Sequence, residues 1–189
     1  MNILKRSTRY VLSIVAKKIS KNHLFEQPQE RETHPPVQLE KPTIEESVCL
    51  SSVAEITQDI LQSKGFLLVH HWATWCDGCM EELDDIQQFV QSLQEEEIST
   101  YAVSWELFNG TPPQNALPVV QHVHNAHNLS FSSHIVKGSP DDLFAVLKLE
   151  EQQIPQTCIY KDGKPLFSHL GILGKEQQDE IRNSIRESL

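Results

Sequence analysis

Two cysteines separated by two residues follow closely on a strand-like apolar run, and this arrangement constrains the fold more than any other part of the sequence. Residues 66–72 form a continuous, mostly apolar run, which is typical of a strand covered on both faces of a central sheet. From Cys79 to Leu93, apolar residues recur with a helical period of about 3.6. We therefore expect a long amphipathic helix that starts at the cysteines, with Cys76 at its N-terminus.

The spacing of Cys76 and Cys79 favours disulfide chemistry, because two sulfurs can meet across one helical turn. The unpaired N–H groups and the dipole of a helix N-terminus lower the pKa of the first thiol. We predict that Cys76 attacks and that Cys79 resolves the mixed disulfide. The alternative, two reduced core cysteines, is disfavoured because Trp75, Asp77 and Gly78 make a poor buried segment. A zinc site needs two further ligands.

Helical and strand patterns alternate along the rest of the chain. Helices are predicted at 52–64, 116–127, 141–149 and from Lys175 onward, and strands at 99–105, around Ile135, at 157–160 and at 166–170. The turn at Asp162-Gly163 makes the last two strands an antiparallel hairpin. The alternation indicates an α/β sheet with helices on both faces.

The first 46 residues differ in composition from the rest. Residues 1–21 hold six Lys or Arg and no acid, and their apolar stretch is far shorter than the roughly 20 residues that span a bilayer. No signal-peptide cleavage site is evident. We interpret 1–21 as a basic, partly amphipathic segment capable of peripheral membrane contact or of acting as a transit segment, with a disordered tail as the alternative. Residues 22–46 are rich in Pro, Glu and Gln, and we predict that they form a linker. Residues 47–189 are predicted to form one folded domain.

Charge excludes one class of partner. The net charge is −10, and after the +6 of the basic segment is removed the remaining residues carry −16. A body this acidic repels phosphate backbones, so nucleic acid is not expected as a partner.

Residues 65–82, GFLLVHHWATWCDGCMEE, resemble thioredoxin-like proteins of the TlpA and ResA type. The resemblance implies a thioredoxin-like α/β fold, with a central mixed sheet flanked by helices and an insertion between the active-site helix and a cis-proline. The segment Ile154-Pro155 matches that proline, which in this family faces the disulfide and leaves backbone free to pair with a substrate chain.

The same resemblance implies a monomeric thiol-disulfide oxidoreductase with no bound cofactor, whose electrons are carried by Cys76 and Cys79. Its partners would be protein disulfides and an upstream thiol reductant. The family points to the cell envelope, with the cytoplasm as the alternative because the sequence shows no clear export signal. Two other functions stay open: a copper-handling protein that uses the thiolates, and a non-catalytic interaction module.

Several residues depart from the family pattern or bear on the chemistry. Asp77 and Glu82 place negative charge near Cys76, which opposes thiolate formation and favours a reductase over an oxidase. Asp84 stands where the family has a helix-kinking Pro, so a straighter helix is expected. His70 lies where related proteins have Asp or Asn, and it could take the proton of Cys79; the alternative is a hydrogen-bonded core histidine.

The two remaining cysteines and a cluster of histidines are predicted to have structural and not catalytic roles. Cys49 and Cys158 are predicted to be small core residues. The cluster on the helix predicted at 116–127 is predicted to be a solvated helix face rather than a metal site, and it consists of His122, His124 and His127.

Overall fold

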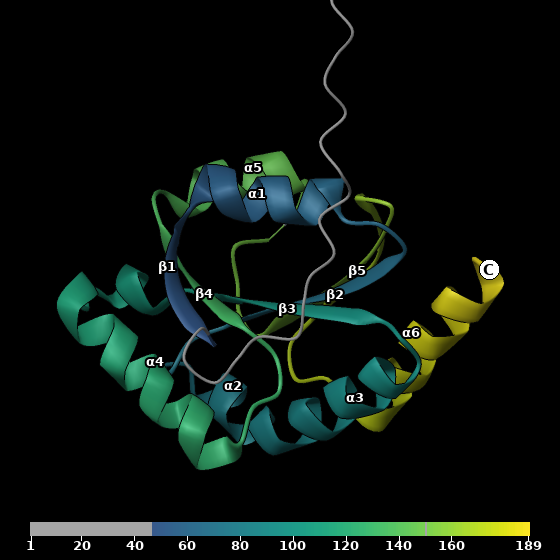
Figure 1. Ribbon diagram of the computed structural model, residues 1–189, viewed down its shortest axis with the longest axis horizontal. Helices are drawn as coiled ribbons and strands as arrows, with labels where there is room; N and C mark the ends of the chain where they lie inside the picture. Colours follow the sequence, from purple (N-terminus) through teal and green to yellow (C-terminus); the bar gives the residue numbers. More distant parts are fainter. Residues whose placement is uncertain (1–46, 150) are drawn as a thin grey trace, which may run out of the picture. The chain divides into compact units, whose positions relative to one another are not determined.

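The computed structural model describes residues 47–149 and 151–189, and its centre is a mixed six-stranded sheet (Figure 1). The strand order is β1-β4-β3-β2-β5-β6, in which the first four are parallel and the last two run antiparallel to their neighbours. The strands are β1 (Val48–Ser52), β2 (Phe66–Trp72), β3 (Ser99–Ser104), β4 (Ser133–Lys137), β5 (Gln156–Lys161) and β6 (Lys164–Leu170).

Helices cover both faces of this sheet. Figure 1 shows α1 and α5 on one face, with α2, α3, α4 and α6 on the other. The helical elements are α1 (Val53–Gln62), α2 (Asp77–Glu81), α3 (Leu83–Glu95), the 3-10 helix η2 (Glu106–Asn109), α4 (Pro113–His127), α5 (Pro140–Leu147) and α6 (Lys175–Glu187). The predicted α/β architecture, a central mixed sheet flanked by helices, is therefore confirmed.

Strand β2 lies in the middle of the sheet, between β3 and β5, and carries the chain to the cysteines. Six of its seven residues are buried, so both faces of the strand are covered as the continuous apolar run predicts. The helix before it, α1, begins with a capping box in which the Ser52 hydroxyl accepts from the Glu55 N–H and the Glu55 carboxylate accepts from the Ser52 N–H.

The helix expected to run unbroken from the cysteines is interrupted, and the expectation of a straighter helix is wrong. Glu82 separates α2 from α3 with φ −88° and ψ −4°. Its carboxylate is fixed by the backbone N–H of Leu173, 2.6 Å away on a distant loop. The break therefore forms without proline, at a residue tied down by a tertiary contact.

The sequence patterns did not predict strand β1, whereas they did predict the turn between β5 and β6. Strand β1 is a five-residue edge strand that runs directly into α1, and so short an element leaves no clear periodicity. The turn between β5 and β6 has positive φ at both central residues, 50° at Asp162 and 71° at Gly163, which is typical of a hairpin turn. The predicted antiparallel hairpin is confirmed.

Two predictions concern residues outside the described ranges, namely the basic segment 1–21 and the linker 22–46. Both stay predictions. Among the described residues, no helix has the length and apolar character that a bilayer crossing requires.

Candidate active site

Cys76 and Cys79 form a disulfide at the start of α2, with an S–S distance of 2.13 Å and Cα atoms 5.2 Å apart. Cys76 is the N-cap residue, and its sulfur accepts a hydrogen bond from the Cys79 N–H at 3.2 Å. Cys79 is fully buried, whereas Cys76 keeps 9% of its surface exposed. A reacting partner can therefore reach the first sulfur more readily than the second.

Glu106, which was not predicted from the sequence, anchors the loop that precedes Cys76. The buried carboxylate of Glu106, at the start of η2, accepts from the Thr74 backbone N–H at 3.0 Å and from its hydroxyl at 2.9 Å. The preceding Trp105 N–H donates to the Trp72 carbonyl at 2.8 Å. Trp75, the residue before Cys76, has a side chain that is 40% exposed.

The Ile154–Pro155 peptide bond is cis, and Pro155 lies against the dipeptide between the cysteines. A Cβ atom placed on Gly78 would lie 3.6 Å from Pro155 Cδ and 3.8 Å from Ile172 Cγ1. Ile172 is 44% exposed, so an apolar side chain borders the dipeptide between the cysteines on this side. No sequence pattern pointed to Ile172, because only the fold brings the loop after β6 to this place.

His70 and Glu82 face each other inside the protein. His70 Nε2 lies 3.7 Å from Glu82 Oε1, and both side chains are 1% exposed. On its other side, His70 Nδ1 is 3.1 Å from the hydroxyl of Thr157. Neither His70 Nε2 nor Glu82 Oε1 has a hydrogen-bond partner among the described residues. Glu82 is three positions after Cys79, so the two residues share one side of the helical segment.

Burial disfavours the charged form of both groups. It lowers the pKa of His70 to about 4. Burial likewise raises the pKa of Glu82 to about 7, although the Leu173 N–H acts in the opposite direction. At neutral pH the imidazole is therefore uncharged and Glu82 is close to its titration midpoint. Together the two groups can hold or release one proton inside the protein.

The other two cysteines behave differently from each other. Cys158 is 1% exposed, and burial raises the pKa of its thiol to about 11, so the prediction of a core residue is confirmed. Cys49 lies on the edge strand β1, is only partly buried, and has its sulfur 3.2 Å from Nδ1 of His134. Its assignment to the core was wrong, because the missed strand β1 lies at the edge of the sheet.

The predicted solvated histidine face is also wrong for one member. His124 is 3% exposed and packs against the rings of Trp72 and Phe131. His127 is partly buried, and its Nδ1 lies 2.7 Å from Asp84 Oδ1. Within residues 47–149 and 151–189, no group of three or more His, Cys, Asp or Glu side chains is arranged to hold a metal ion.

Comparisons with known proteins agree with this architecture at the level of structure. No family model matches the chain, and no curated protein matches it. A putative thioredoxin from Neisseria meningitidis superposes with a TM-score of 0.51 at 22% identity, covering 68% of this chain and 79% of that one. The thioredoxin domain of a thiol-disulfide oxidoreductase from Bacteroides vulgatus gives 0.51 at 12% identity, covering 68% and 83%. A secreted thiol-disulfide isomerase from Corynebacterium glutamicum gives 0.50 at 16% identity, covering 65% and 70%.

These neighbours share the central mixed sheet and the flanking helices described above. Their sequence identities to this chain are low, so the similarity is evidence for the fold and not for the function. The chain therefore has a thioredoxin-like fold.

Proposed function

We propose that the protein is a thiol-disulfide oxidoreductase of the TlpA and ResA type that reduces disulfides in protein substrates. The observation that carries this proposal is the disulfide itself. It joins Cys76, which is 9% exposed at a helix N-terminus, to a fully buried Cys79, and Pro155 lies against the Gly78 between them. The disulfide-linked pair accounts for two-electron chemistry without any bound cofactor.

The reaction begins with the reduced protein. The Cys76 thiolate attacks one sulfur of a substrate disulfide, so that a mixed disulfide forms and the first substrate sulfur leaves as a thiolate. Cys79 then attacks the sulfur of Cys76, which releases the second substrate thiolate and restores the Cys76–Cys79 disulfide. Two electrons have passed to the substrate, and an external thiol reductant returns two to the protein.

The resolving step needs a base, because Cys79 must lose its proton inside the protein. The buried pair of His70 and Glu82 supplies two candidate acceptors, an uncharged imidazole and a carboxyl group with a pKa of about 7. Neither group's facing atom is engaged in a hydrogen bond among the described residues. We assign the proton transfer to this pair.

The charge around Cys76 supports one direction of electron flow. Asp77 is the next residue, and the sequence contains no Lys or Arg from residue 65 to residue 136. Nothing cationic in that stretch stabilises the thiolate, and a less stable thiolate makes a more reducing centre. Glu82 adds to this effect only when ionised, above its pKa of about 7. The charge around Cys76 therefore favours a reductase over an oxidase.

Substrate binding involves the exposed surface beside the disulfide. Trp75 and Ile172 offer apolar area, and Ile154-Pro155 offers backbone at which an extended chain can pair. The substrates are therefore proposed to be polypeptides with an accessible disulfide in an extended segment.

The decisive experiment measures the reduction potential of the pair in a variant that lacks Cys49 and Cys158, so that only two thiols report. The protein is equilibrated in dithiothreitol or glutathione buffers, and free thiols are trapped. A reversible two-electron transition at or below about −250 mV, in the thioredoxin range, supports the reductase. A value near about −120 mV reverses the direction, and the absence of a transition rejects the function.

A further inference from the structure

The outer side of α4 lacks charged residues, although the protein as a whole is strongly charged. No Asp, Glu, Lys or Arg occurs from residue 107 to residue 136, whereas charged residues make up 22% of the chain. This uncharged stretch includes all of α4. Every other α-helix that the structure describes exposes at least one Asp or Glu. The surface of α4 therefore differs in kind from that of the other helices.

Six exposed residues form the outer side of α4. The inner side is marked by Ala116, Val120 and His124, which are buried and recur at the spacing of a helical face. Figure 1 shows the outer side at the edge of the described domain, with no other helix packed on it. We refer to the outer residues as the uncharged face of α4; they are Leu117, Pro118, Val119, His122, Asn125 and Ala126.

Three consecutive residues of this face are apolar. Leu117 and Val119 are 37% and 42% exposed, and Pro118 between them is exposed as well. Pro118 lacks the N–H that would bond to the carbonyl of Gln114 one turn earlier, so its ring adds apolar surface without a backbone donor. Such a patch gains free energy when a partner removes it from water.

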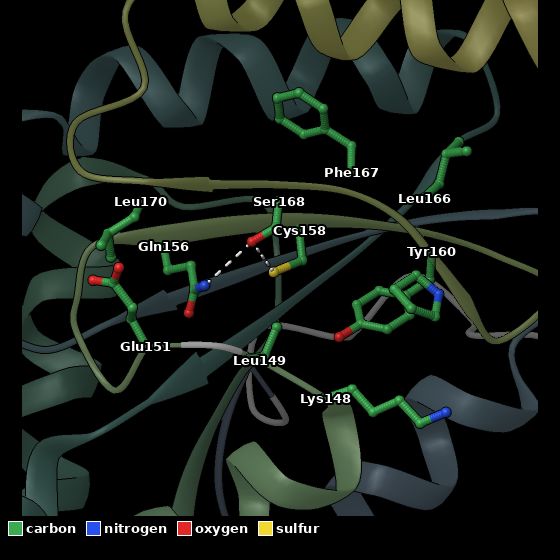
Figure 2. Close-up of a pocket in the computed structure, with 11 residues that line it drawn as sticks. Lys148, Leu149, Glu151, Gln156, Cys158, Tyr160, Leu166, Phe167, Ser168 and Leu170 are labelled. Carbon is green, nitrogen blue, oxygen red and sulfur yellow. Dashed lines mark hydrogen bonds between the residues drawn. The ribbon is translucent and has the colours of Figure 1, made fainter.

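Two exposed apolar side chains elsewhere show the more usual arrangement, with charged residues nearby. Leu166 on β6 lines a pocket together with Lys148 and Glu151 (Figure 2). Val146 on α5 lies four residues after the exposed Asp142, which places both on one side of the helix. Exposed apolar area that is depleted of charge, as on α4, is typical of the centre of a protein interface.

The polar members of the face can pair with identical copies of themselves. The amide of Asn125 both donates and accepts hydrogen bonds, and an imidazole such as that of His122 does so in its neutral form. A carboxylate or an ammonium group would instead meet its own charge across a twofold axis. The face is therefore self-complementary, as the interface of a symmetric dimer has to be.

The net charge of the protein indicates which partner fits this face. A basic partner would be drawn to the acidic surfaces of the other helices rather than to α4. A second copy carries the same net charge of −10, so those surfaces repel it and it can approach closely only where acidic residues are absent. The uncharged face of α4 meets that condition.

One exposed acidic residue at the C-terminal end of α4 sets the direction of pairing. Asp84 Oδ1 is 2.7 Å from Nδ1 of His127, and the Asp84 side chain is 74% exposed. With parallel helices, the two Asp84 side chains would lie side by side. With antiparallel helices they lie about 22 Å apart, one length of the 15-residue helix, which is well beyond the screening length of about 8 Å.

We propose that the uncharged face of α4 binds the same face of a second copy, with the two helices antiparallel. The helix is about 22 Å long and roughly 10 Å wide, so this contact alone covers less than the roughly 800 Å² per partner of a stable interface. The dimer is therefore weak, with an expected dissociation constant between about 10 μM and 1 mM. The family resemblance implies a monomer, which is the form that dominates below this concentration range.

Sedimentation equilibrium of the full-length oxidised protein, from about 10 μM to about 1 mM, measures this association. We expect a reversible monomer–dimer equilibrium that becomes tighter when NaCl rises from about 0.05 to about 0.5 M, because salt screens the repulsion between two acidic copies. An association between the basic residues 1–21 and an acidic surface would weaken instead. A non-reducing gel excludes dimers that are joined covalently through Cys49.

Two valine variants provide a matched comparison. Val119 and Val146 are 42% and 46% exposed on different helices, and only Val119 belongs to the uncharged face of α4. Val119→Glu places like charges within the proposed contact and should weaken the dimer at least about tenfold. Val146→Glu adds the same charge far from the contact, where salt screens it, and should leave the dissociation constant within about twofold. Leu117→Glu tests the opposite flank of the face and should act like Val119→Glu.

The proposal is overturned if the parent protein stays monomeric up to about 1 mM, if the association is lost in high salt, or if Val119→Glu and Val146→Glu associate equally. A monomer would leave the face to a different protein, and loss in salt would assign the association to residues 1–21. None of these measurements depends on the proposed redox activity, so they test the surface separately from the function.

Discussion

Glu106 holds Thr74 through both its backbone N–H and its hydroxyl, at 3.0 and 2.9 Å, although 32 residues separate the two in sequence. Thr74 is two residues before Cys76, so this carboxylate fixes the loop that presents the attacking sulfur. Glu106 is 2% exposed, and a buried carboxylate requires such partners.

Removing the Thr74 hydroxyl should therefore destabilise the protein. Thr74→Val keeps the shape and the backbone bond but leaves the Glu106 carboxylate short of one donor. Hydrogen bonds to charged groups contribute about 1.5–3 kcal/mol, so we expect the free energy of unfolding to fall by about 2 kcal/mol. Urea unfolding measures this change. Thr74→Ser retains the hydroxyl and serves as the control; equal stability of the valine and serine variants would contradict the role assigned to this contact.

Glu82 should make stability fall as pH rises through the weakly acidic range. Its pKa is raised from 4.5 to about 7 on folding, chiefly by burial. Between these values the folded protein binds more protons than the unfolded chain, so stability declines with rising pH and levels off above about pH 7. The raised pKa corresponds to a loss of about 3 kcal/mol across this window.

The comparison with Glu82→Gln isolates this effect, because the buried histidines change stability in both proteins alike. The amide oxygen of glutamine can still accept from the Leu173 N–H. We expect the difference in unfolding free energy between the two proteins, measured in urea at pH 4.5, 6 and 8, to shift in favour of glutamine as pH rises. A pH-independent difference would show that the pKa of Glu82 is not raised.

The parts of the fold that local sequence patterns control were predicted well. The apolar run at 66–72 became the central strand, and the Asp162-Gly163 turn became the β5–β6 hairpin, because each pattern depends on neighbouring residues. The positions of the two cysteines at a helix start followed from the same kind of local pattern. Their pairing in one disulfide needs only the turn that joins them.

The features that sequence reasoning missed depend on contacts between distant segments. Glu106 meets Thr74 only after β2 and β3 pair in parallel, which brings the ends of both strands together. Glu82, at which the helix is interrupted, has its carboxylate bound by the N–H of the distant Leu173. His124 is buried by Trp72 and Phe131, although its neighbours on α4 suggested a solvated face. No periodicity within a single element reports such contacts.

His70 should accelerate the step in which Cys79 attacks the mixed disulfide. Burial lowers the pKa of its imidazole to about 4, so His70 is neutral at pH 7 but a weak base, and we expect it to pass the proton of Cys79 on to Glu82, whose pKa of about 7 makes it the better acceptor. General base catalysis contributes about 100-fold or more, so His70→Ala should slow resolution by at least about tenfold, even if Glu82 substitutes in part. Rapid acid quenching of a mixed disulfide on Cys76, followed by mass spectrometry, measures this rate at pH 7.

The matched control is His71→Ala, which removes an equally buried imidazole from the other face of the same strand. His71 contacts Trp105 and Phe144 instead of Glu82. Loss of packing is therefore similar in the two variants, while only one removes a group that faces Glu82. Equal resolution rates in the two variants would assign His70 a purely structural role.

Gly163 should tolerate a methyl group far less well than Gly65, although the two have nearly the same backbone conformation. Their φ angles are +71° and +69°, so alanine at either position pays a similar cost of about 1 kcal/mol for the left-handed conformation. A Cβ on Gly163 would lie 1.9 Å from the carbonyl oxygen of Leu61, whereas one on Gly65 meets nothing within 4 Å. We therefore expect Gly65→Ala to lower the unfolding free energy by about 1 kcal/mol and Gly163→Ala by at least about 3 kcal/mol, since the hairpin must move away from α1. Denaturant unfolding of both variants measures the difference, and equal losses would mean that the turn between β5 and β6 does not pack against α1 as closely as the structure shows.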